Sequence, residues 1–524
     1  MLRRRAPLLL TLPALATVGA MLLPLAYLVV RAAGADRDAW DVLDVDRTGP
    51  LVLDTLALVG VVVVSAAAVG VPLAWLVVRT DLPGRTFWAV SAALPLVIPS
   101  YVAALVLLGA LGPRGLVQDL LEEPFGVERL PEIYGLPGAA VALTLSTYPY
   151  VFLLTSAALR DLDPSLEEAA RSLGHSGFGA FRRVTLPALR PSLAAGGLLV
   201  ALYVLSDFGA VSLMDYPALT RSIYLQYQAL FDREPAAVLS LVLVFLAGVV
   251  LVLESAFRRR ARYHRASPGT ARAAAPVALG RWRWPALAFC ALVVGIFLVL
   301  PVAVLVYWAW ETGPLDVPWG HARNSLLASA LAAGIAVAAV LPVALLSQRH
   351  PAPWTRALER GSYTANALPG IVIALSLVFF GARYGGIAYQ TLAMLVFAYV
   401  VRFAPQALAA TSSALRTVDP RMEEAARGLG HRPVSVLVRI TAPVIRPGLL
   451  AGAALVFLSA MKELPATLLL RPIGFDTLAT EIWTETSVAA YSDAAPAALL
   501  LVAVSAPFVY VLAARRGADV GPVD

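Results

Sequence analysis

Long apolar stretches recur along this chain, and short polar segments separate them. Twelve of the stretches are long enough to cross a membrane, because a spanning helix needs about 20 apolar residues. We expect these spans near residues 7–32, 51–78, 86–111, 136–159, 192–214, 235–257, 285–310, 324–347, 362–381, 387–415, 448–470 and 495–514. The pattern therefore predicts an all-α polytopic membrane protein.

The composition supports the same class of protein. The chain has 524 residues, of which 59% are hydrophobic and 14% are charged, whereas a soluble domain is about 25% charged. The single cysteine, Cys290, falls in a predicted span. A disulfide framework and a cysteine metal site are thereby excluded.

Charge alternates between the polar segments. Arginines gather in residues 3–5, 258–265 and 515–516, whereas acidic residues gather in 36–46 and 122–132. Cytoplasmic loops carry the excess of Lys and Arg in membrane proteins. We therefore expect both termini in the cytoplasm, and the net charge of +7 indicates topology. No nucleic-acid partner is predicted.

One polar segment occurs twice. Residues 160–191 and 416–447 are identical at 16 of 32 positions, and each copy lies between the fourth and fifth spans of its half. An Arg-, Ala- and Pro-rich stretch, 258–284, reads as a flexible cytoplasmic linker between the halves 1–257 and 285–524. Six spans per half give both copies one orientation, so we predict two parallel six-helix repeats.

Each copy of the polar segment carries helix-end signals. Asp163 suits an N-cap and Pro164 the first helical position, and Gly174 can take the left-handed closing conformation. We predict a capped helix of about ten residues that ends at Leu173, followed by a second short helix that ends near residues 184–187. The second copy repeats the pattern. Duplicated, exposed Glu, Arg and His residues indicate docking; the alternative is an ordinary capped interfacial helix.

These residues form a motif. The first copy reads Glu-Ala-Ala at 168–170, Gly174, then Val-Thr-Leu-Pro at 184–187, and the second reads Glu-Ala-Ala at 424–426, Gly430, then Ile-Thr-Ala-Pro at 440–443. This resembles the permease subunits of binding-protein-dependent ABC importers, whose signature is Glu-Ala-Ala, three residues, Gly, nine residues and Ile-x-Leu-Pro. The chain departs from it conservatively, with Val184 for Ile and Ala442 for Leu.

The resemblance implies that each loop forms a coupling helix seated in a groove of an ATPase subunit. The implied coupling residues are Glu167, Glu168, Ala169, Ala170, Arg171, Gly174, His175, Glu423, Glu424, Ala425, Ala426, Arg427, Gly430 and His431. The implied partners are two copies of an ABC ATPase, an extracytoplasmic substrate-binding protein and the lipid bilayer of a bacterial plasma (inner) membrane.

A nucleotide site is missing from the sequence. The phosphate loop needs a lysine after glycine, and the only lysine here is Lys462. We therefore expect a non-catalytic subunit that binds no cofactor, with ATP and Mg²⁺ bound by the partner ATPases.

The sequence is compatible with more than one transported substrate. Residues 205–214 and 461–472 resemble the iron(III) branch of these permeases, with thiamine, phosphonate and polyamine permeases as alternatives. An ion-driven secondary transporter or a channel is the competing class, but neither would need paired coupling loops.

Charged residues also fall inside predicted spans. Asp207 lies in the fifth span, and Lys462 and Glu463 lie in the eleventh. Charge at membrane depth is costly and usually faces a bundle interior or a water path. These residues could line the translocation path or its gate, and carboxylates suit Fe³⁺. They could equally form a structural ion pair involving Arg402. We assign no metal site.

Overall fold

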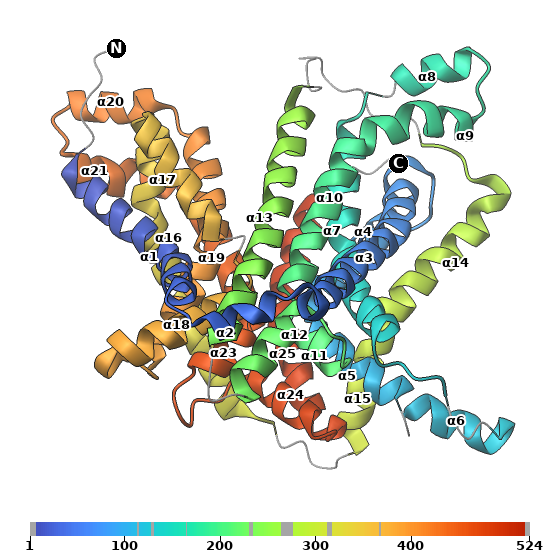
Figure 1. Cartoon of the computed structure of the whole chain (residues 1–524). Helices are drawn as coiled ribbons and strands as arrows, with labels where there is room; N and C mark the ends of the chain where they lie inside the picture. The colour runs from blue at the N-terminus through green and yellow to red at the C-terminus, as the bar shows by residue number, and fades with distance from the viewer. Residues whose placement is uncertain are drawn as a thin grey trace. The chain divides into compact units, whose positions relative to one another are not determined.

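A computed structural model of the chain describes residues 7–112, 115–126, 130–163, 165–229, 234–263, 276–311, 317–365 and 368–518. In these residues the regular structure is helical, apart from an isolated bridge between Thr80 and Val277. Eleven helices of the described part are long and apolar enough to cross a membrane. The predicted all-α polytopic fold is confirmed (Figure 1).

The helices form two compact units. Unit 1 comprises Met1–Leu43, Ile223–Val244 and Val317–Glu481, and unit 2 comprises Asp44–Ser222, Phe245–Asp316 and Ile482–Asp524. Three helices run from one unit into the other: α12 (Leu219–Ala229), α13 (Glu234–Tyr263) and α24 (Leu478–Ser487).

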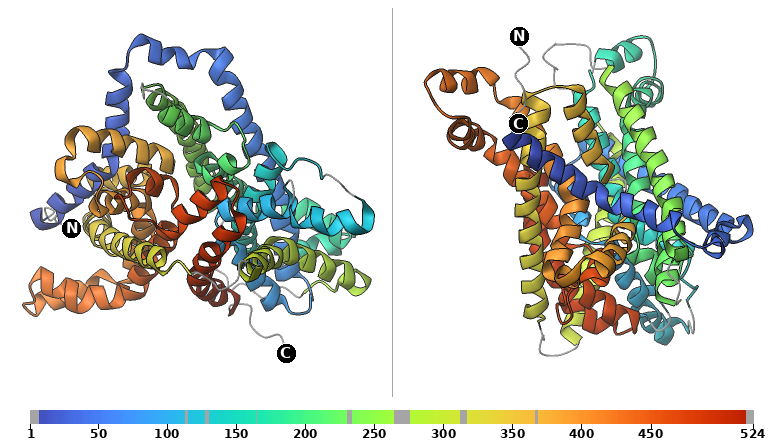
Figure 2. Two further views of the ribbon diagram at one scale, coloured as in Figure 1. Left: turned by 90° about the horizontal axis from the view of Figure 1, so that it is seen from below. Right: turned by 60° about the vertical axis from the view of Figure 1, so that its left-hand side comes forward.

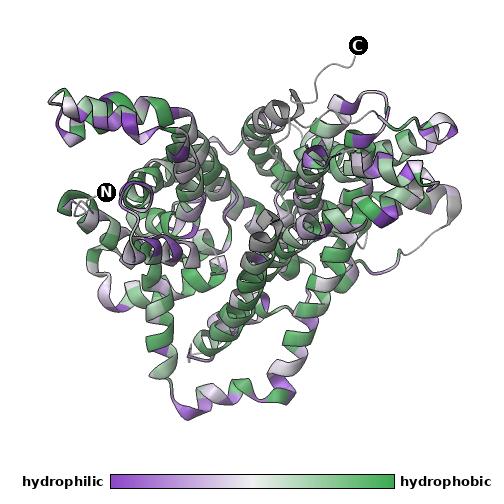
Figure 3. Ribbon diagram, turned by 90° about the horizontal axis from the view of Figure 1, so that it is seen from above, coloured by the Kyte–Doolittle hydropathy of each residue, from purple (hydrophilic) through white to green (hydrophobic). Residues whose placement is uncertain are grey.

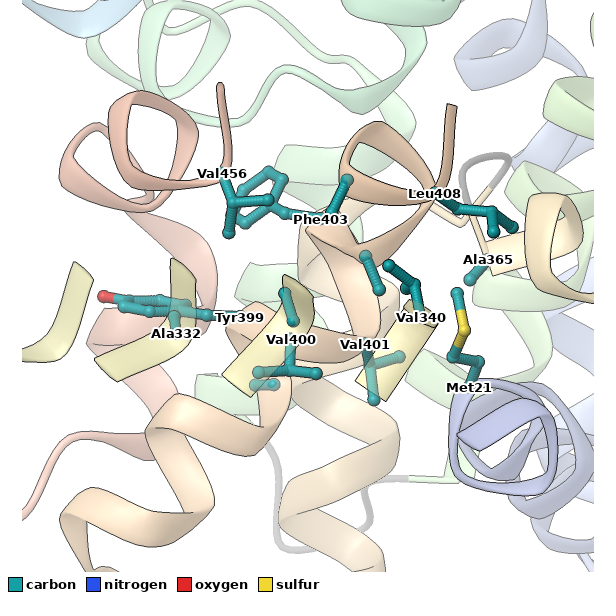
Figure 4. Close-up of a cluster of buried hydrophobic side chains, with 14 of the residues drawn as sticks. Met21, Ala332, Val340, Ala365, Tyr399, Val400, Val401, Phe403, Leu408 and Val456 are labelled. Carbon is teal, nitrogen blue, oxygen red and sulfur yellow. The ribbon is translucent and has the colours of Figure 1, made fainter. Parts of the chain in front are cut away.

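Unit 1 is built around α16 and α19. Its helices are α1 (Leu8–Ala33), α2 (Arg37–Trp40), α16 (Trp319–Arg349), α17 (Pro353–Thr364), α18 (Gly370–Tyr384), α19 (Leu392–Thr417), α20 (Pro420–Gly428), α21 (Pro433–Val436), α22 (Ala442–Met461) and α23 (Pro465–Leu470). Figure 2 shows α1, in dark blue, against the yellow and orange helices of this unit. Met21 of α1 lies in one buried cluster with Val340, Val401 and Leu408 (Figure 4).

Unit 2 is built around α3 and α7. Its helices are α3 (Val45–Arg79), α4 (Arg85–Ala93), α5 (Ser100–Leu111), α6 (Leu116–Phe125), α7 (Leu136–Asp161), α8 (Ser165–Ser172), α9 (Gly177–Ala180), α10 (Leu186–Ser206), α11 (Gly209–Leu213), α14 (Arg283–Val294), α15 (Leu300–Glu311) and α25 (Tyr491–Ala518). The ring of Trp308 on α15 lies so close to Gly109 on α5 that an added Cβ would be 1.8 Å from it. Only glycine fits this approach.

The compact units do not follow the order of the sequence. Helix α1 belongs to the first predicted repeat but packs on α16 and α18 of the second. Helices α14, α15 and α25 belong to the second predicted repeat but pack with α4 and α5 of the first. The repeat boundaries at 257 and 285 describe the order of the sequence and stay a prediction. The compact units differ from them, because α1, α14, α15 and α25 each pack in the unit formed mainly by the other half.

Two predicted spans are broken helices. The span 86–111 consists of α4, a turn at Leu94–Val97 and α5, and Pro99 stands directly before α5. The span 362–381 covers only the last residues of α17 and most of the 15-residue α18, with Pro369 directly before α18. Proline lacks the N–H that would continue a helix and clashes with the preceding turn. This is why α18 falls short of a spanning length.

The predicted linker is more structured at its ends than expected. Helix α13 extends to Tyr263, and residues 264–275 lie outside the described residues. Val277 then hydrogen-bonds with the backbone of Arg79 and Asp81, and Leu279 donates to the Asp81 carboxylate at 2.8 Å. The end of the linker is therefore fixed to α3. In the ribbon of Figure 3, hydrophobic residues, in green, predominate along the long helices.

Candidate functional site

The second polar loop begins with a capped helix. The Asp419 carboxylate accepts a hydrogen bond from the Arg421 N–H at 2.9 Å, and Pro420 occupies the first position of α20. Gly430 has a φ of 87°, and the His431 N–H donates to the Ala426 carbonyl. A left-handed residue after the helix lets the last carbonyls find donors. The predicted cap and closing glycine are confirmed for this copy.

The first polar loop has the same geometry. Asp163 accepts from the Ser165 N–H at 2.9 Å, and this hydrogen bond lowers the pKa of the Asp163 carboxyl. Gly174 has a φ of 88°, and the His175 N–H donates to the Ala170 carbonyl. Pro164 lies outside the described residues. Helix α8 thus has its cap and its closing glycine at positions equivalent to those of α20.

The prediction of a second, separate short helix in each loop is wrong. After α9 the chain makes a π-helical turn at Phe181–Thr185 that leads directly into α10, and after α21 another at Leu437–Thr441 leads into α22. Pro187 and Pro443 therefore lie inside continuous helices. A wider turn before each proline accommodates its missing N–H and its ring.

The predicted coupling residues divide between two faces. The exposed ones are Glu168, Ala169, Arg171, Gly174, Glu424, Ala425, Arg427, Gly430 and His431. Ala170, Ala426 and Glu423 are buried, and Glu167 and His175 are partly buried. Leu173 and Leu429, which the sequence did not single out, are 81% and 83% exposed. Each helix thus offers an outward face of one glutamate, one arginine and one leucine.

Glu423 points into the protein. Its Oε1 accepts from Thr441 Oγ1 at 3.0 Å and lies 3.1 Å from Arg349 Nη2, while its Oε2 lies 3.5 Å from Arg427 Nη2. Glu423 is 4% exposed. A buried carboxylate needs such partners, so the first glutamate of this loop holds the loop in place.

Glu167 is the equivalent residue in the first loop. It accepts a hydrogen bond from Thr185, and Arg79 Nη2 donates to the Leu162 carbonyl at 3.4 Å. Sequence reasoning missed these roles for the arginines and threonines. The signal was available, because Arg79 and Arg349 occupy matching positions at the ends of the second spans and Thr185 and Thr441 belong to the motif.

Asp207 lies at a helix break within the stretch predicted as the fifth span. Helix α10 ends at Ser206, and Asp207 has an extended backbone with ψ of 135°. Its Oδ1 accepts from the N–H groups of Ala210 and Val211 at 3.0 and 3.4 Å, and its Oδ2 accepts from Ser100. The carboxylate therefore caps α11 and contacts the first residue of α5.

Glu463 has a similar place in unit 1. Helix α22 ends at Met461, and Glu463 Oε1 accepts from the Ala466 N–H of α23 at 3.2 Å and from Arg402 Nη1 at 2.9 Å. Glu463 is 5% exposed. Lys462, directly after α22, is partly buried. The proposed structural partner Arg402 is thus present, and Glu463 also lies at a helix break within its predicted span.

Both carboxylates meet the start of a broken third span. Ser100 begins α5 and contacts Asp207, while Gly370 begins α18 and lies under the Arg402 guanidinium. An added Cβ at Gly370 would be 1.2 Å from Arg402 Nη1 and 2.8 Å from Glu463 Oε1. Negative charge at a helix N-terminus is favourable. Among the described residues, no three His, Cys, Asp or Glu side chains gather as a metal site would require.

The long apolar helices and the two equivalent capped loops, one in each half, are the arrangement expected of a two-half permease. The chain matches the family described as "Binding-protein-dependent transport system inner membrane component" over residues 66–263 and 330–516, and it belongs to this family. The resemblance to the permeases of binding-protein-dependent importers is confirmed. The protein is a multi-pass inner-membrane component and a non-catalytic subunit of an ABC importer.

Relatives of two lengths resemble the chain. It is 32% identical to the Fe(3+)-transport system permease protein FbpB 2 of Haemophilus influenzae, over 97% of this chain and 98% of that protein. It is 23% identical to the putative ferric transport system permease protein FbpB 1 of the same organism, over 75% and 65%. The molybdenum transport system permease protein ModB of Escherichia coli is 30% identical over 40% of this chain and 93% of its own length.

The Arg402–Glu463 pair generates the first prediction. In Arg402→Met, Glu463 stays buried without its cation, and we expect a loss of about 3 kcal/mol or more in the free energy of unfolding. The double variant Arg402→Met/Glu463→Gln removes both charges and should recover most of this loss. Thermal unfolding in detergent measures both. A single variant as stable as the wild type would contradict the pairing.

Proposed function

We propose that this protein is the membrane permease of an ATP-driven importer for ferric iron. The supporting observation is the 32% identity, along nearly the whole of both chains, with a permease named for Fe(3+) transport. The relatives named for molybdenum and sulfate match only 36–40% of this chain. These coverages favour iron over sulfate or molybdenum as the substrate.

The proposed machine has separate subunits for energy and for substrate capture. Two copies of an ABC ATPase bind ATP and Mg²⁺ on the cytoplasmic side, and an extracytoplasmic binding protein delivers iron. Both termini of the permease are cytoplasmic, as the arginine distribution indicates. The paired loops favour this machine over an ion-driven transporter or channel, which needs no site for an ATPase.

We propose that the exposed faces of α8 and α20 dock on the ATPases. Each face combines a carboxylate (Glu168 or Glu424), a guanidinium (Arg171 or Arg427) and an exposed leucine. An apolar anchor beside complementary charges is typical of a protein interface. Glu167 and Glu423 do not belong to these exposed faces, because their carboxylates face the protein. They support the docking by holding the loops in position.

The translocation path is proposed to pass the helix breaks at Asp207 and at Lys462 and Glu463. Broken helices with polar groups at their ends are common at the binding sites of transporters, where unwound backbone meets a cavity. A change in either break would alter the start of α5 or α18, so these residues suit a gate.

Iron uptake tests the substrate. Proteoliposomes that contain the permease and its ATPase, with the binding protein outside, should accumulate radiolabelled Fe³⁺. They should do so only when ATP is enclosed on the side of the membrane that carries the ATPases. Molybdate, sulfate and thiamine should neither be taken up nor compete. ATPase stimulation by thiamine or an oxyanion, without stimulation by iron-loaded binding protein, would overturn the iron assignment.

Docking predicts that Glu424→Ala weakens the permease–ATPase complex. Removing an interface charge should raise the Kd by about tenfold, which is about 1.4 kcal/mol. Asp493→Ala, an exposed acidic residue in the first turn of α25, is the matched control and should leave the Kd unchanged. Equal affinities for Glu424→Ala and the control would contradict docking through this face.

The gate proposal predicts that Asp207→Asn and Glu463→Gln lose uptake by about tenfold or more while inserting normally, because a neutral amide replaces a charge at the path. The measurement is the initial rate of iron uptake at matched protein density. Normal rates in both variants would sink the proposal and leave the two carboxylates as helix caps.

A further inference from the structure

We propose that Arg349 and Arg79 are positioning residues that tie each coupling helix to the ends of neighbouring spans. The inference rests on the proposed coupling to ATPases, and it adds the residues through which movement of α20 and α8 would reach the membrane helices. The stronger tie is that of Arg349.

The Arg349 guanidinium joins three helices. Arg349 is the last residue of α16, and its Nε and Nη2 lie 3.2 and 3.1 Å from Glu423 Oε1 of α20. The same Nη2 donates to the carbonyls of Leu415 and Val418, at the end of α19, at 3.4 and 3.2 Å. A guanidinium at a helix C-terminus also meets the negative end of the helix dipole.

A fourth helix is joined through Glu423. Thr441 closes the π-helical turn before α22, and its hydroxyl donates to the same Oε1 of Glu423 at 3.0 Å. The side chains of Arg349 and Glu423 are 13% and 6% exposed. Water therefore screens this pair little, and a fork of fixed donors holds the carboxylate in one orientation. We call Arg349, Glu423 and Thr441 the clamp of α20.

The clamp of α8, formed by Arg79, Glu167 and Thr185, has the same residues and fewer bonds. Thr185 donates to Glu167, and Arg79 donates to the Leu162 carbonyl at the end of α7 at 3.4 Å. Glu167 attracts the Arg79 guanidinium, but among the described residues the two form no ion pair within 4.0 Å, and the buried Arg79 Nε has no hydrogen-bond partner there. The α8 helix is thus tied to the following span and less firmly to the preceding ones.

This arrangement has a mechanical consequence. A push on α20 cannot tilt it independently, because the ends of α16, α19 and α22 converge on one buried pair. Movement of the coupling helix then becomes movement of three spans together. The exposed face is free to contact the ATPase, while the buried glutamate transmits the displacement.

The test uses the full permease with its ATPase and binding protein. In Arg349→Met, we expect amide hydrogen exchange in 420–428 to speed up by about tenfold or more, since a buried pair is broken. Iron transported per ATP hydrolysed should fall by a similar factor. ATP hydrolysis and ATPase binding should remain near those of the wild type, because the outward face of α20 is unchanged.

A second variant separates positioning from folding. Arg349→Met/Glu423→Gln leaves no buried charge, so it should regain wild-type thermal stability, yet exchange in 420–428 should stay fast and transport per ATP low. Arg349→Lys keeps the charge without the fork and should restore part of both. Arg383→Met, at an exposed site on α18, is the control and should change neither.

The outcomes are decisive in each direction. Unchanged exchange in 420–428 for both the single and the double variant would overturn the inference whatever the substrate. Recovery of transport per ATP in the double variant would also overturn it, because the role would be charge balance alone. A wild-type complex that hydrolyses ATP but imports no iron would contradict the proposed substrate, while the exchange measurement still tests the clamp.

The two halves should differ. Because Glu167 attracts Arg79 without the close ion pair that Arg349 makes with Glu423, Arg79→Met should accelerate exchange in 165–172 by a smaller factor than Arg349→Met does in 420–428. Equal effects in the two halves would contradict the asymmetry.

Discussion

The buried pair of Arg349 and Glu423 is the interaction on which the coupling loop of unit 1 depends. In lipid there is little hydrophobic drive to hold one apolar helix against another, so close packing and polar contacts between helices decide their arrangement. Glu423 supplies the acceptor that lets the ends of α16, α20 and α22 meet. The pair of Arg402 and Glu463 does similar work at the start of α18 and α23.

The duplicated sequence has produced two related but unequal sites. Both loops keep an aspartate cap, a left-handed glycine and a π-helical turn before proline. The contacts of the two loop arginines differ. The partners of the two buried carboxylates differ as well, because Asp207 accepts a hydrogen bond from Ser100 and Glu463 accepts one from Arg402. One chain that supplies both halves can specialise each half separately, which two identical subunits cannot do.

Much of the architecture was predictable because it depends on local signals. Apolar length predicts the spans, and Asp419, Pro420 and Gly430 predict the ends of α20. The sequence did not predict that α1 packs with the second repeat, since apolar surface carries no partner identity. It also did not show the helix breaks at Asp207 and Glu463, because hydropathy averages over such a break. Glu167 and Glu423 were grouped with their exposed neighbours, since only packing shows which of two adjacent glutamates faces inward.

The central claim is that α20 and the second span of its half move as one body. Spin labels at Met422 of α20 and Ile335 of α16, both exposed positions, after replacement of Cys290, would measure the distance between α20 and α16 in the assembled transporter. The account predicts that this distance changes by less than about 2 Å between the nucleotide-free and ATP-bound states. A change of about 5 Å, one helical turn, in the wild-type protein would contradict it.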